Sequence, residues 1–190
     1  MDTNWILINS FKYPVNVLGP GKRIVVWTQG CSIRCKGCMS EHTWKFDKTK
    51  KVNIKEFVKL LMKFNSFSIT ISGGEPFEQE NFYFFLKELR ENGFRDILVY
   101  SGYKYEYIKK NFKNCLYLID VLISEPFELG NESNKIYKGS ENQKAIIFNK
   151  SIFPKYEKFL TKKKEKKLQI FEDLIVGIPY QKDIERIINE

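Results

Sequence analysis

The stretch Thr28-Gln-Gly-Cys31-Ser-Ile-Arg-Cys35-Lys-Gly-Cys38 decides how this chain is interpreted. Its three cysteines have the spacing C-x3-C-x2-C. Three thiolates this close together can ligate three irons of a 4Fe-4S cluster, which leaves the fourth iron without a protein ligand. An iron with an open position can bind a substrate. The spacing therefore indicates a catalytic iron–sulfur site rather than an electron store.

Two other uses of these cysteines fit less well. A structural zinc site takes four Cys or His ligands, and His42, the only histidine, lies four residues after Cys38. The resulting C-x3-C-x2-C-x3-H zinc knuckle would have an unusual spacing, and we expect His42 to be a loop residue. A disulfide framework conflicts with the odd number of cysteines in the cluster. Cys115 stands apart, and we expect it to be a buried structural thiol.

Length and composition indicate one globular domain. The chain has 190 residues and is 43% hydrophobic, with 16 Phe and 10 Tyr, which argues against disorder. We expect a single domain over residues 1–190, with a core over about 5–148 and a C-terminal extension over about 150–190 of unassigned role. No apolar run reaches membrane-spanning length, and the N-terminus lacks a signal-peptide pattern. Free thiolates favour a reducing compartment, so we expect a cytoplasmic location.

The chain is basic, with a net charge of +9 from 32 Lys+Arg and 23 Asp+Glu. Part of this charge is concentrated in the run Lys162–Lys167. A basic surface can bind nucleic acid, but the sequence has no basic stripe interleaved with aromatic residues. We therefore interpret the run as a solvated segment and expect no nucleic-acid partner.

The hydrophobic pattern alternates between strands and helices. Strands are predicted over Arg23–Trp27, Phe67–Ile71, Asp96–Tyr100 and Leu118–Ile123, with weaker candidates at Lys144–Phe148 and Leu168–Phe171. Helices are predicted over Asn53–Phe64, Glu78–Asn92 and Lys104–Phe112, with further candidates at Pro154–Leu160 and Gln181–Asn189. This alternation is typical of an α/β protein with a mainly parallel sheet.

Chemically informative residues follow the predicted strands. The cysteine segment follows the first, Ser72-Gly-Gly-Glu75 the second, Ser101-Gly-Tyr103 the third and Ser124-Glu-Pro-Phe127 the fourth. Because ligands gather at the carboxyl ends of parallel strands, four such loops on one edge predict a single site.

The segment Ser72-Gly73-Gly74-Glu75-Pro76 has a plausible role at that site. Glycines let a backbone approach a ligand closely. Exposed carbonyls and the Glu75 carboxylate can hold an ammonium group, and Pro76 stiffens the turn. Two simpler interpretations are that the glycines only make a tight turn and that Glu75 buttresses the loop.

Together the two motifs resemble those of the radical S-adenosylmethionine (radical SAM) enzymes. More narrowly, the chain resembles the anaerobic ribonucleotide reductase activating proteins and the related pyruvate formate-lyase activating enzymes. The resemblance covers about residues 5–148. Besides the two motifs, it is carried by Gly19-Pro-Gly-Lys-Arg23, Val99-Tyr-Ser-Gly-Tyr103, Asp120-Val-Leu-Ile-Ser-Glu-Pro-Phe127 and Tyr137-Lys-Gly-Ser-Glu-Asn-Gln143.

The resemblance implies a fold and a site. The fold would be a partial (β/α) barrel of about five to six parallel strands, of the radical SAM type. Cys31, Cys35 and Cys38 would ligate the 4Fe-4S cluster. Residues that would contact S-adenosylmethionine are Ser72, Gly73, Gly74, Glu75, Pro76, Ser101 and Ser124.

The resemblance also implies an anaerobic reaction. A flavodoxin or ferredoxin-type reductant would supply one electron, and S-adenosylmethionine would be cleaved to a 5′-deoxyadenosyl radical. That radical would abstract a hydrogen atom from a glycine of a partner glycyl-radical enzyme. No protein acid or base is needed for this step, so we name no catalytic residue.

The chain departs from the family pattern at two places. Met39-Ser40-Glu41 replaces the usual His-Asn-Pro, and Ser124-Glu125 replaces the usual Asp-Gly. Two alternatives therefore stay open. One is a radical SAM enzyme that modifies a ribosomal peptide or a nucleotide, and the other is a non-catalytic zinc or iron–sulfur interaction module.

Overall fold

The protein contains one large mixed β-sheet. A computed structural model describes residues 4–164, 168–172 and 174–180. In these ranges seven strands form the sheet, in the spatial order β3 (Lys51–Asn53), β1 (Trp5–Val15), β2 (Arg23–Thr28), β4 (Ser68–Gly73), β5 (Asp96–Tyr100), β6 (Val121–Ser124) and β7 (Lys144–Ile147).

The centre of this sheet is parallel. Strands β2, β4, β5 and β6 are neighbours and run in the same direction, whereas β1 pairs antiparallel with β2 and β7 pairs antiparallel with β6. The predicted α/β class is confirmed. The run of neighbouring parallel strands is shorter than the predicted five to six, because its two flanking strands have the opposite direction. Closure into a partial barrel stays a prediction.

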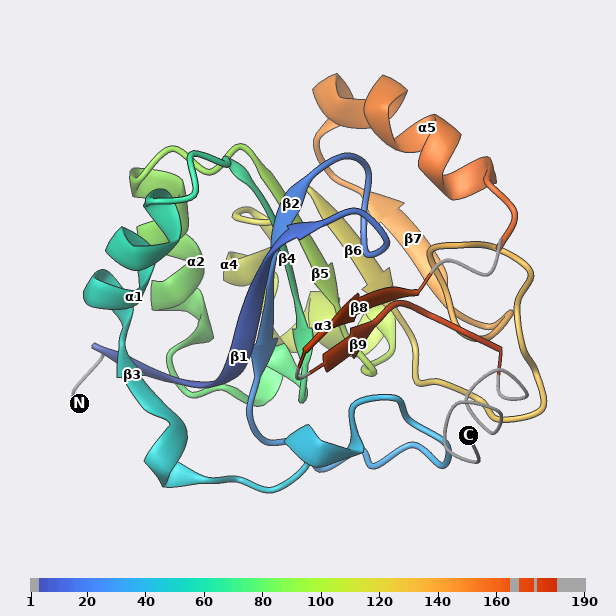
Figure 1. Cartoon of the computed structure of the whole chain (residues 1–190), viewed down its shortest axis with the longest axis horizontal. Coiled ribbons are helices and arrows are strands. Elements are labelled where there is room, and N and C mark those ends of the chain that lie inside the picture. Colours follow the sequence, from blue (N-terminus) through green and yellow to red (C-terminus); the bar gives the residue numbers. More distant parts are fainter. Residues whose placement is uncertain (1–3, 165–167, 173, 181–190) are drawn as a thin grey trace.

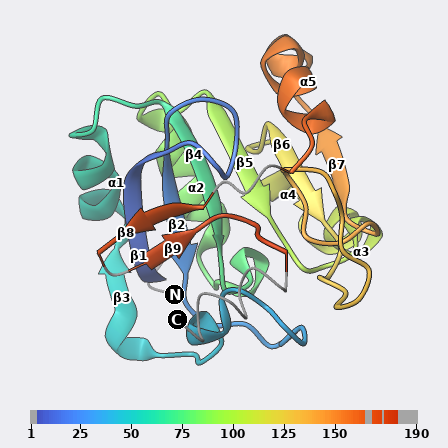
Figure 2. The same cartoon turned by 45° about the vertical axis from the view of Figure 1, so that its right-hand side comes forward.

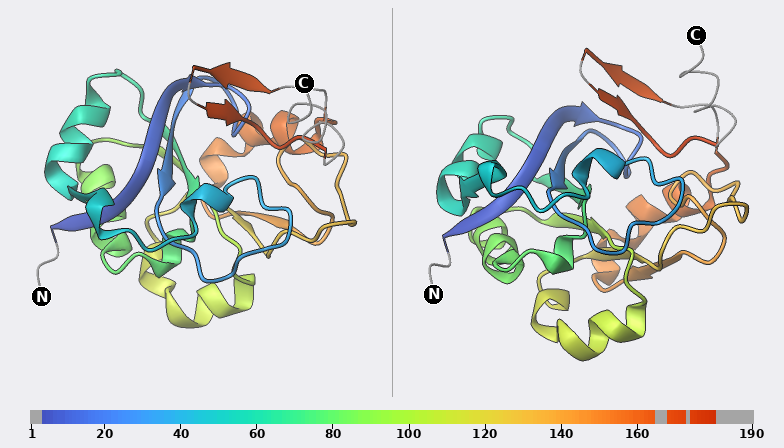
Figure 3. Two further views of the ribbon diagram at one scale, coloured as in Figure 1. Left: turned by 60° about the horizontal axis from the view of Figure 1, so that its bottom comes forward. Right: turned by 90° about the horizontal axis from the view of Figure 1, so that it is seen from below.

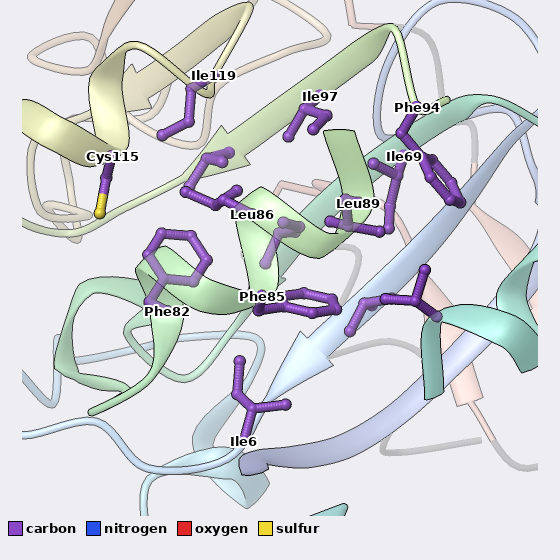
Figure 4. Close-up of a cluster of buried hydrophobic side chains, with 14 of the residues drawn as sticks. Ile6, Ile69, Phe82, Phe85, Leu86, Leu89, Phe94, Ile97, Cys115 and Ile119 are labelled. Carbon is purple, nitrogen blue, oxygen red and sulfur yellow. The ribbon is translucent and has the colours of Figure 1, made fainter. Parts of the chain in front are cut away.

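Four helices cover one face of the sheet, as Figure 1 shows: α1 (Ile54–Met62), α2 (Phe82–Glu91), α3 (Tyr105–Asn111) and α4 (Lys113–Leu116). The start of α1 is fixed by Asn53, whose side chain accepts a hydrogen bond from the Glu56 amide at 3.1 Å. Its buried residues recur at helical spacing and face the sheet. Figure 4 shows the resulting core, in which Phe85, Leu86 and Leu89 of α2 pack with Ile69 and Ile97 of the sheet.

The other face is covered by the C-terminal part of the chain. Helix α5 (Phe153–Thr161) packs there through Tyr156 and Phe159. The hairpin of β8 (Gln169–Phe171) and β9 (Leu174–Val176) packs on another part of this face through Val176, in a cluster with Val25 and Trp27 of β2. Figures 1 and 2 show the hairpin in front of the sheet, and Figure 3 shows it on the side away from α3 and α4.

A buried charge network joins the amino ends of the parallel strands to α5. The guanidinium of Arg23, fully buried, donates to the Ile69 carbonyl at 2.7 Å and pairs with Asp96 at 3.2 Å. Asp96 also accepts hydrogen bonds from Lys155 and from the Tyr156 hydroxyl. Burial alone would raise the pKa of Asp96, but these three partners lower it. The network therefore holds an ionised carboxylate inside the protein.

Two differences from the predicted elements concern β1 and the start of α2. Strand β1 was not predicted, although it is the longest strand described. The helix predicted over Glu78–Asn92 begins only at Phe82, since Pro76–Glu78 forms a separate 3-10 helix, η3. The helix predicted over Gln181–Asn189 lies outside the described residues. Within the described ranges, every helix is too short or too polar to traverse a lipid bilayer.

Candidate functional site

Loops from the ends of neighbouring parallel strands meet around one cavity of about 200 Å³. The cysteine loop follows β2, the Gly-Gly-Glu segment follows β4 and Ser101-Gly102 follows β5. The lining includes all three predicted cluster cysteines together with Ser72, Gly73, Glu75 and Ser101. The structure thus brings together most residues that the sequence singled out, at the edge where they were expected.

The cysteine loop is anchored at its start by backbone hydrogen bonds. The Gly30 amide donates to the Thr43 carbonyl at 2.7 Å, and the Cys31 amide donates to the Trp44 carbonyl at 3.0 Å. Gly30 has φ +108°, and a Cβ there would lie 2.4 Å from the Phe46 ring. A glycine is therefore required where the chain turns from β2 into the loop.

The three thiols of this loop are free and partly buried. Burial raises the pKa of each thiol, while nearby N–H donors oppose that shift. For Cys38 the donor is the Ser40 amide, 3.4 Å from Sγ. N–H groups aimed at sulfur also stabilise a metal-bound thiolate, so the loop suits cysteines that ligate iron.

These thiols fit the donor set of a 4Fe-4S cluster, because three of them share one loop and one cavity. A single-ion site would need all its ligands around one point. Over the residues that the structure describes, no group of three or more His, Cys, Asp or Glu side chains has that arrangement. His42 lines the cavity on the short 3-10 helix Glu41–Thr43, and burial lowers the pKa of its imidazole.

The Gly-Gly-Glu segment packs directly against the cysteine loop. The Gly74 amide donates to the Thr28 carbonyl, and the Glu75 amide donates to the Gly30 carbonyl, both at 2.9 Å. A Cβ on Gly74 would lie 2.3 Å from the Gly30 oxygen, and one on Gly73 would lie 2.6 Å from the Thr28 amide nitrogen. Both glycines therefore allow two backbones to touch, and the predicted approach of these glycines to a ligand stays a prediction.

The carboxylate of Glu75 is buried and accepts three hydrogen bonds. Oε1 accepts from the Ser101 hydroxyl at 2.8 Å and from the Phe77 amide at 3.1 Å, and Oε2 accepts from the Gly102 amide at 2.8 Å. Burial raises the pKa of Glu75 to about 7 in spite of these donors. An ionised carboxylate has about four acceptor positions, so Glu75 can buttress the loop and keep one position for a ligand.

The remaining predicted residues are placed as follows. Ser72 lines the cavity, and its carbonyl accepts from the Thr28 hydroxyl at 3.2 Å. Pro76 is buried at the start of the 3-10 helix η3. Ser124 ends β6, is fully buried and is absent from the described lining of the cavity. Its hydroxyl has no hydrogen-bond partner among the described residues.

Two contributors to the site were missed by sequence reasoning. The segment Leu174–Pro179 forms one wall of the cavity. The wall includes β9, and Gln169 of the paired strand β8 is bound to the end of β1 and the residue that follows it. Its side chain donates to the Pro14 carbonyl at 2.6 Å and accepts from the Asn16 amide at 3.1 Å. Glu78 was assigned to a helix but contacts the cysteine loop. Both contacts join residues far apart in the sequence, so no local pattern reveals them.

Comparison with known proteins agrees with this geometry. The family described as a 4Fe-4S single cluster domain matches residues 17–146, which include every loop of the site except the Leu174–Pro179 wall. The chain belongs to this family.

Its relatives include activating proteins of two kinds. The chain is 31% identical over 142 residues to the anaerobic ribonucleoside-triphosphate reductase-activating protein of Enterobacteria phage T4, covering 70% of this chain and 88% of that protein. It is 31% identical over 144 residues to the protein of the same name from Haemophilus influenzae, covering 69% of this chain and 92% of that protein. It is 33% identical over 111 residues to the pyruvate formate-lyase-activating enzyme of Clostridium pasteurianum, covering 54% of this chain and 47% of that enzyme. These matches make the chain a member of the radical SAM group of activating enzymes.

Proposed function

We propose that this protein is a radical SAM activating enzyme that installs a glycyl radical on a partner enzyme such as anaerobic ribonucleotide reductase. The carrying observation is that Cys31, Cys35, Cys38 and the Gly-Gly-Glu segment line one cavity at the ends of the parallel strands. Its resident cofactors are a 4Fe-4S cluster and S-adenosylmethionine. When bound, the cluster supplies the electron that cleaves the sulfonium bond and yields a 5′-deoxyadenosyl radical.

The residues of the chain have separate tasks in this proposal. The three cysteine thiolates hold the cluster. Gly73 and Gly74 let the two loops touch, and the remaining acceptor position of Glu75 takes the ammonium group of S-adenosylmethionine. Ser101 holds the Glu75 carboxylate at 2.8 Å, so it acts on the ligand through that side chain. Ser124 is fully buried and is absent from the described lining, and we propose that it reaches the ligand only if the loop after β6 moves.

The charges around the cavity favour a polypeptide substrate over a nucleotide. The titratable side chains in its described lining, apart from the cysteines and Tyr100, are Glu75, Glu132 and His42. Carboxylates attract the sulfonium and ammonium groups of S-adenosylmethionine and repel phosphates. The apolar wall Leu174–Pro179 suits an uncharged segment of polypeptide. We therefore propose a backbone glycine as the hydrogen donor and a single domain in which the Leu174–Pro179 segment faces that substrate.

The test is an anaerobic reaction. The reconstituted and reduced protein is mixed with S-adenosylmethionine and with the anaerobic ribonucleotide reductase of the same organism, and 5′-deoxyadenosine and the glycyl radical signal are measured. We expect both products. The control is the Cys31→Ala, Cys35→Ala, Cys38→Ala triple variant, which should form neither.

Three results would count against the proposal. Deoxyadenosine without a radical on the reductase would exclude this partner and favour another radical SAM substrate. A colourless protein with bound zinc would exclude the cluster. Retained cleavage in the triple cysteine variant would exclude the proposed ligands.

A further inference from the structure

Glu78 joins three loops of the site through one carboxylate. It ends η3 (Pro76–Glu78), three residues after Glu75. Its Oε2 accepts from the Ser32 amide at 2.8 Å, and its Oε1 accepts from the Ser32 hydroxyl and, at 2.7 Å, from the Tyr103 hydroxyl. The loop after β4 is thereby tied to the cysteine loop on one side and to the loop after β5 on the other.

The position of Ser32 gives this contact its significance. Ser32 follows Cys31 directly, within the three residues that separate Cys31 from Cys35. Both of its donors, the backbone N–H and the hydroxyl, point to the same carboxylate, which restrains the backbone and the side chain together. Hydrogen bonds to an ionised acceptor are stronger than neutral ones. The peptide beside Cys31 is therefore fixed by a side chain from a different loop.

The short 3-10 helix makes this contact possible. If Glu78 began a longer helix, as its sequence context suggests, its side chain would be directed along that helix. Pro76 instead starts a single turn, with the Glu75 side chain accepting from the Phe77 amide at its beginning. The two carboxylates then hold different groups: Glu75 accepts from Ser101 and Gly102, and Glu78 accepts from Ser32 and Tyr103.

We propose that Glu78 is a positioning residue that holds the cysteine loop in the conformation that binds iron. The proposal rests on the proposed function, because it assumes that these cysteines take up a cluster. Without Glu78 the Ser32 peptide is free to rotate, so iron dissociates faster. Glu78 is absent from the described lining of the cavity, so we assign it an indirect role, through Ser32 and Tyr103.

The test compares single variants of the full chain. Glu78→Ala removes all three hydrogen bonds, Glu78→Gln keeps an acceptor of the same shape, and Tyr103→Phe removes only the bond to the loop after β5. The matched control is Glu80→Ala, which removes an exposed carboxylate two residues further on. Two quantities are measured: hydrogen exchange of the Ser32 amide in the iron-free protein, and the rate at which a strong iron chelator bleaches the reconstituted protein.

We expect the Glu78→Ala protein to lose protection of the Ser32 amide and to release iron about tenfold faster than wild type, which corresponds to about 1.4 kcal/mol. Glu78→Gln should restore part of the amide protection and part of the iron retention. Tyr103→Phe should show a smaller increase in the rate of iron release, and Glu80→Ala should behave as wild type in both measurements. Partial rescue by Gln separates positioning from general loss of folding.

Equal amide exchange in the Glu78→Ala and Glu80→Ala proteins would overturn the proposal, as would equal iron release. If the wild-type protein took up no iron at all, the proposed function would fail. In that case the exchange of the Ser32 amide in iron-free protein would still decide whether Glu78 fixes the loop.

Discussion

Replacing Gly74 by alanine should separate the two loops that build the site. The added Cβ would lie 2.3 Å from the Gly30 oxygen, whereas ordinary contacts begin at 3.4 Å, so the backbones must move apart by about 1 Å. That movement breaks two hydrogen bonds of 2.9 Å, from Gly74 to Thr28 and from Glu75 to Gly30. Each of the two buried amide donors left unpaired costs about 1–3 kcal/mol, so the variant should lose about 2–6 kcal/mol of unfolding free energy.

The assay is urea unfolding of the iron-free protein, with iron content after reconstitution as a second readout. Gly130→Ala is the control, since a Cβ there meets nothing within 4 Å, although its φ of +84° adds backbone strain of about 1–2 kcal/mol. We expect Gly74→Ala to be the less stable variant and to bind less iron. If it were no less stable than Gly130→Ala, the close packing of the two loops would not contribute as argued.

Three further predictions concern other parts of the molecule. Arg23→Met should lower the free energy of unfolding by about 3–5 kcal/mol, because it leaves the buried Asp96 carboxylate without its main positive partner. Lys155→Met should lower it by less than about 1 kcal/mol, because the Lys155 side chain is 42% exposed. Equal losses of stability in urea unfolding would contradict this difference. The pKa of Glu75 is about 7 in the folded protein and 4.5 ordinarily, so the folded state binds the proton more tightly and the contribution of Glu75 to stability should fall as the pH rises from about 4.5 to about 7. Glu75→Gln should remove that contribution, so in urea unfolding of iron-free protein the stability of the variant relative to wild type should rise across this range; a constant difference would contradict the assignment. Ile178→Asp, on the cavity wall, should lower the glycyl radical yield on the reductase at least tenfold relative to Ile170→Asp, at a residue of β8 that is 75% exposed. Equal yields would remove the Leu174–Pro179 wall from the substrate path.

The sequence was most informative where a local pattern and a buried environment coincide. The strand predicted over Asp96–Tyr100 has the observed bounds, and the four parallel strands of the centre were all predicted. Both faces of such strands are covered, so consecutive residues are apolar and the strand is visible in the sequence as a short continuous apolar run. The position of the site followed directly, because the motifs come at the ends of these strands.

The missed features depend on contacts between distant segments. Strand β1 has register shifts between Ile8 and Ser10 and between Lys12 and Val15, which interrupt the alternation that identifies a strand. The tether between Glu78 and Ser32 spans 46 residues. The cavity wall of Leu174–Pro179 lies beyond the region that resembles the family. Propensity and spacing carry no information about such pairs, which only tertiary packing creates.

The network of Arg23 and Asp96 is a position at which the stability of the protein could be engineered. Asp96 begins β5 and Tyr100 ends it, so the five residues of this strand place the network about 15 Å from the cavity loops. The residues of the network, Arg23, Asp96, Lys155 and Tyr156, are all absent from the described lining of the cavity. Thermal robustness could therefore be raised by redesigning the amino ends of the strands without replacing a residue of that lining.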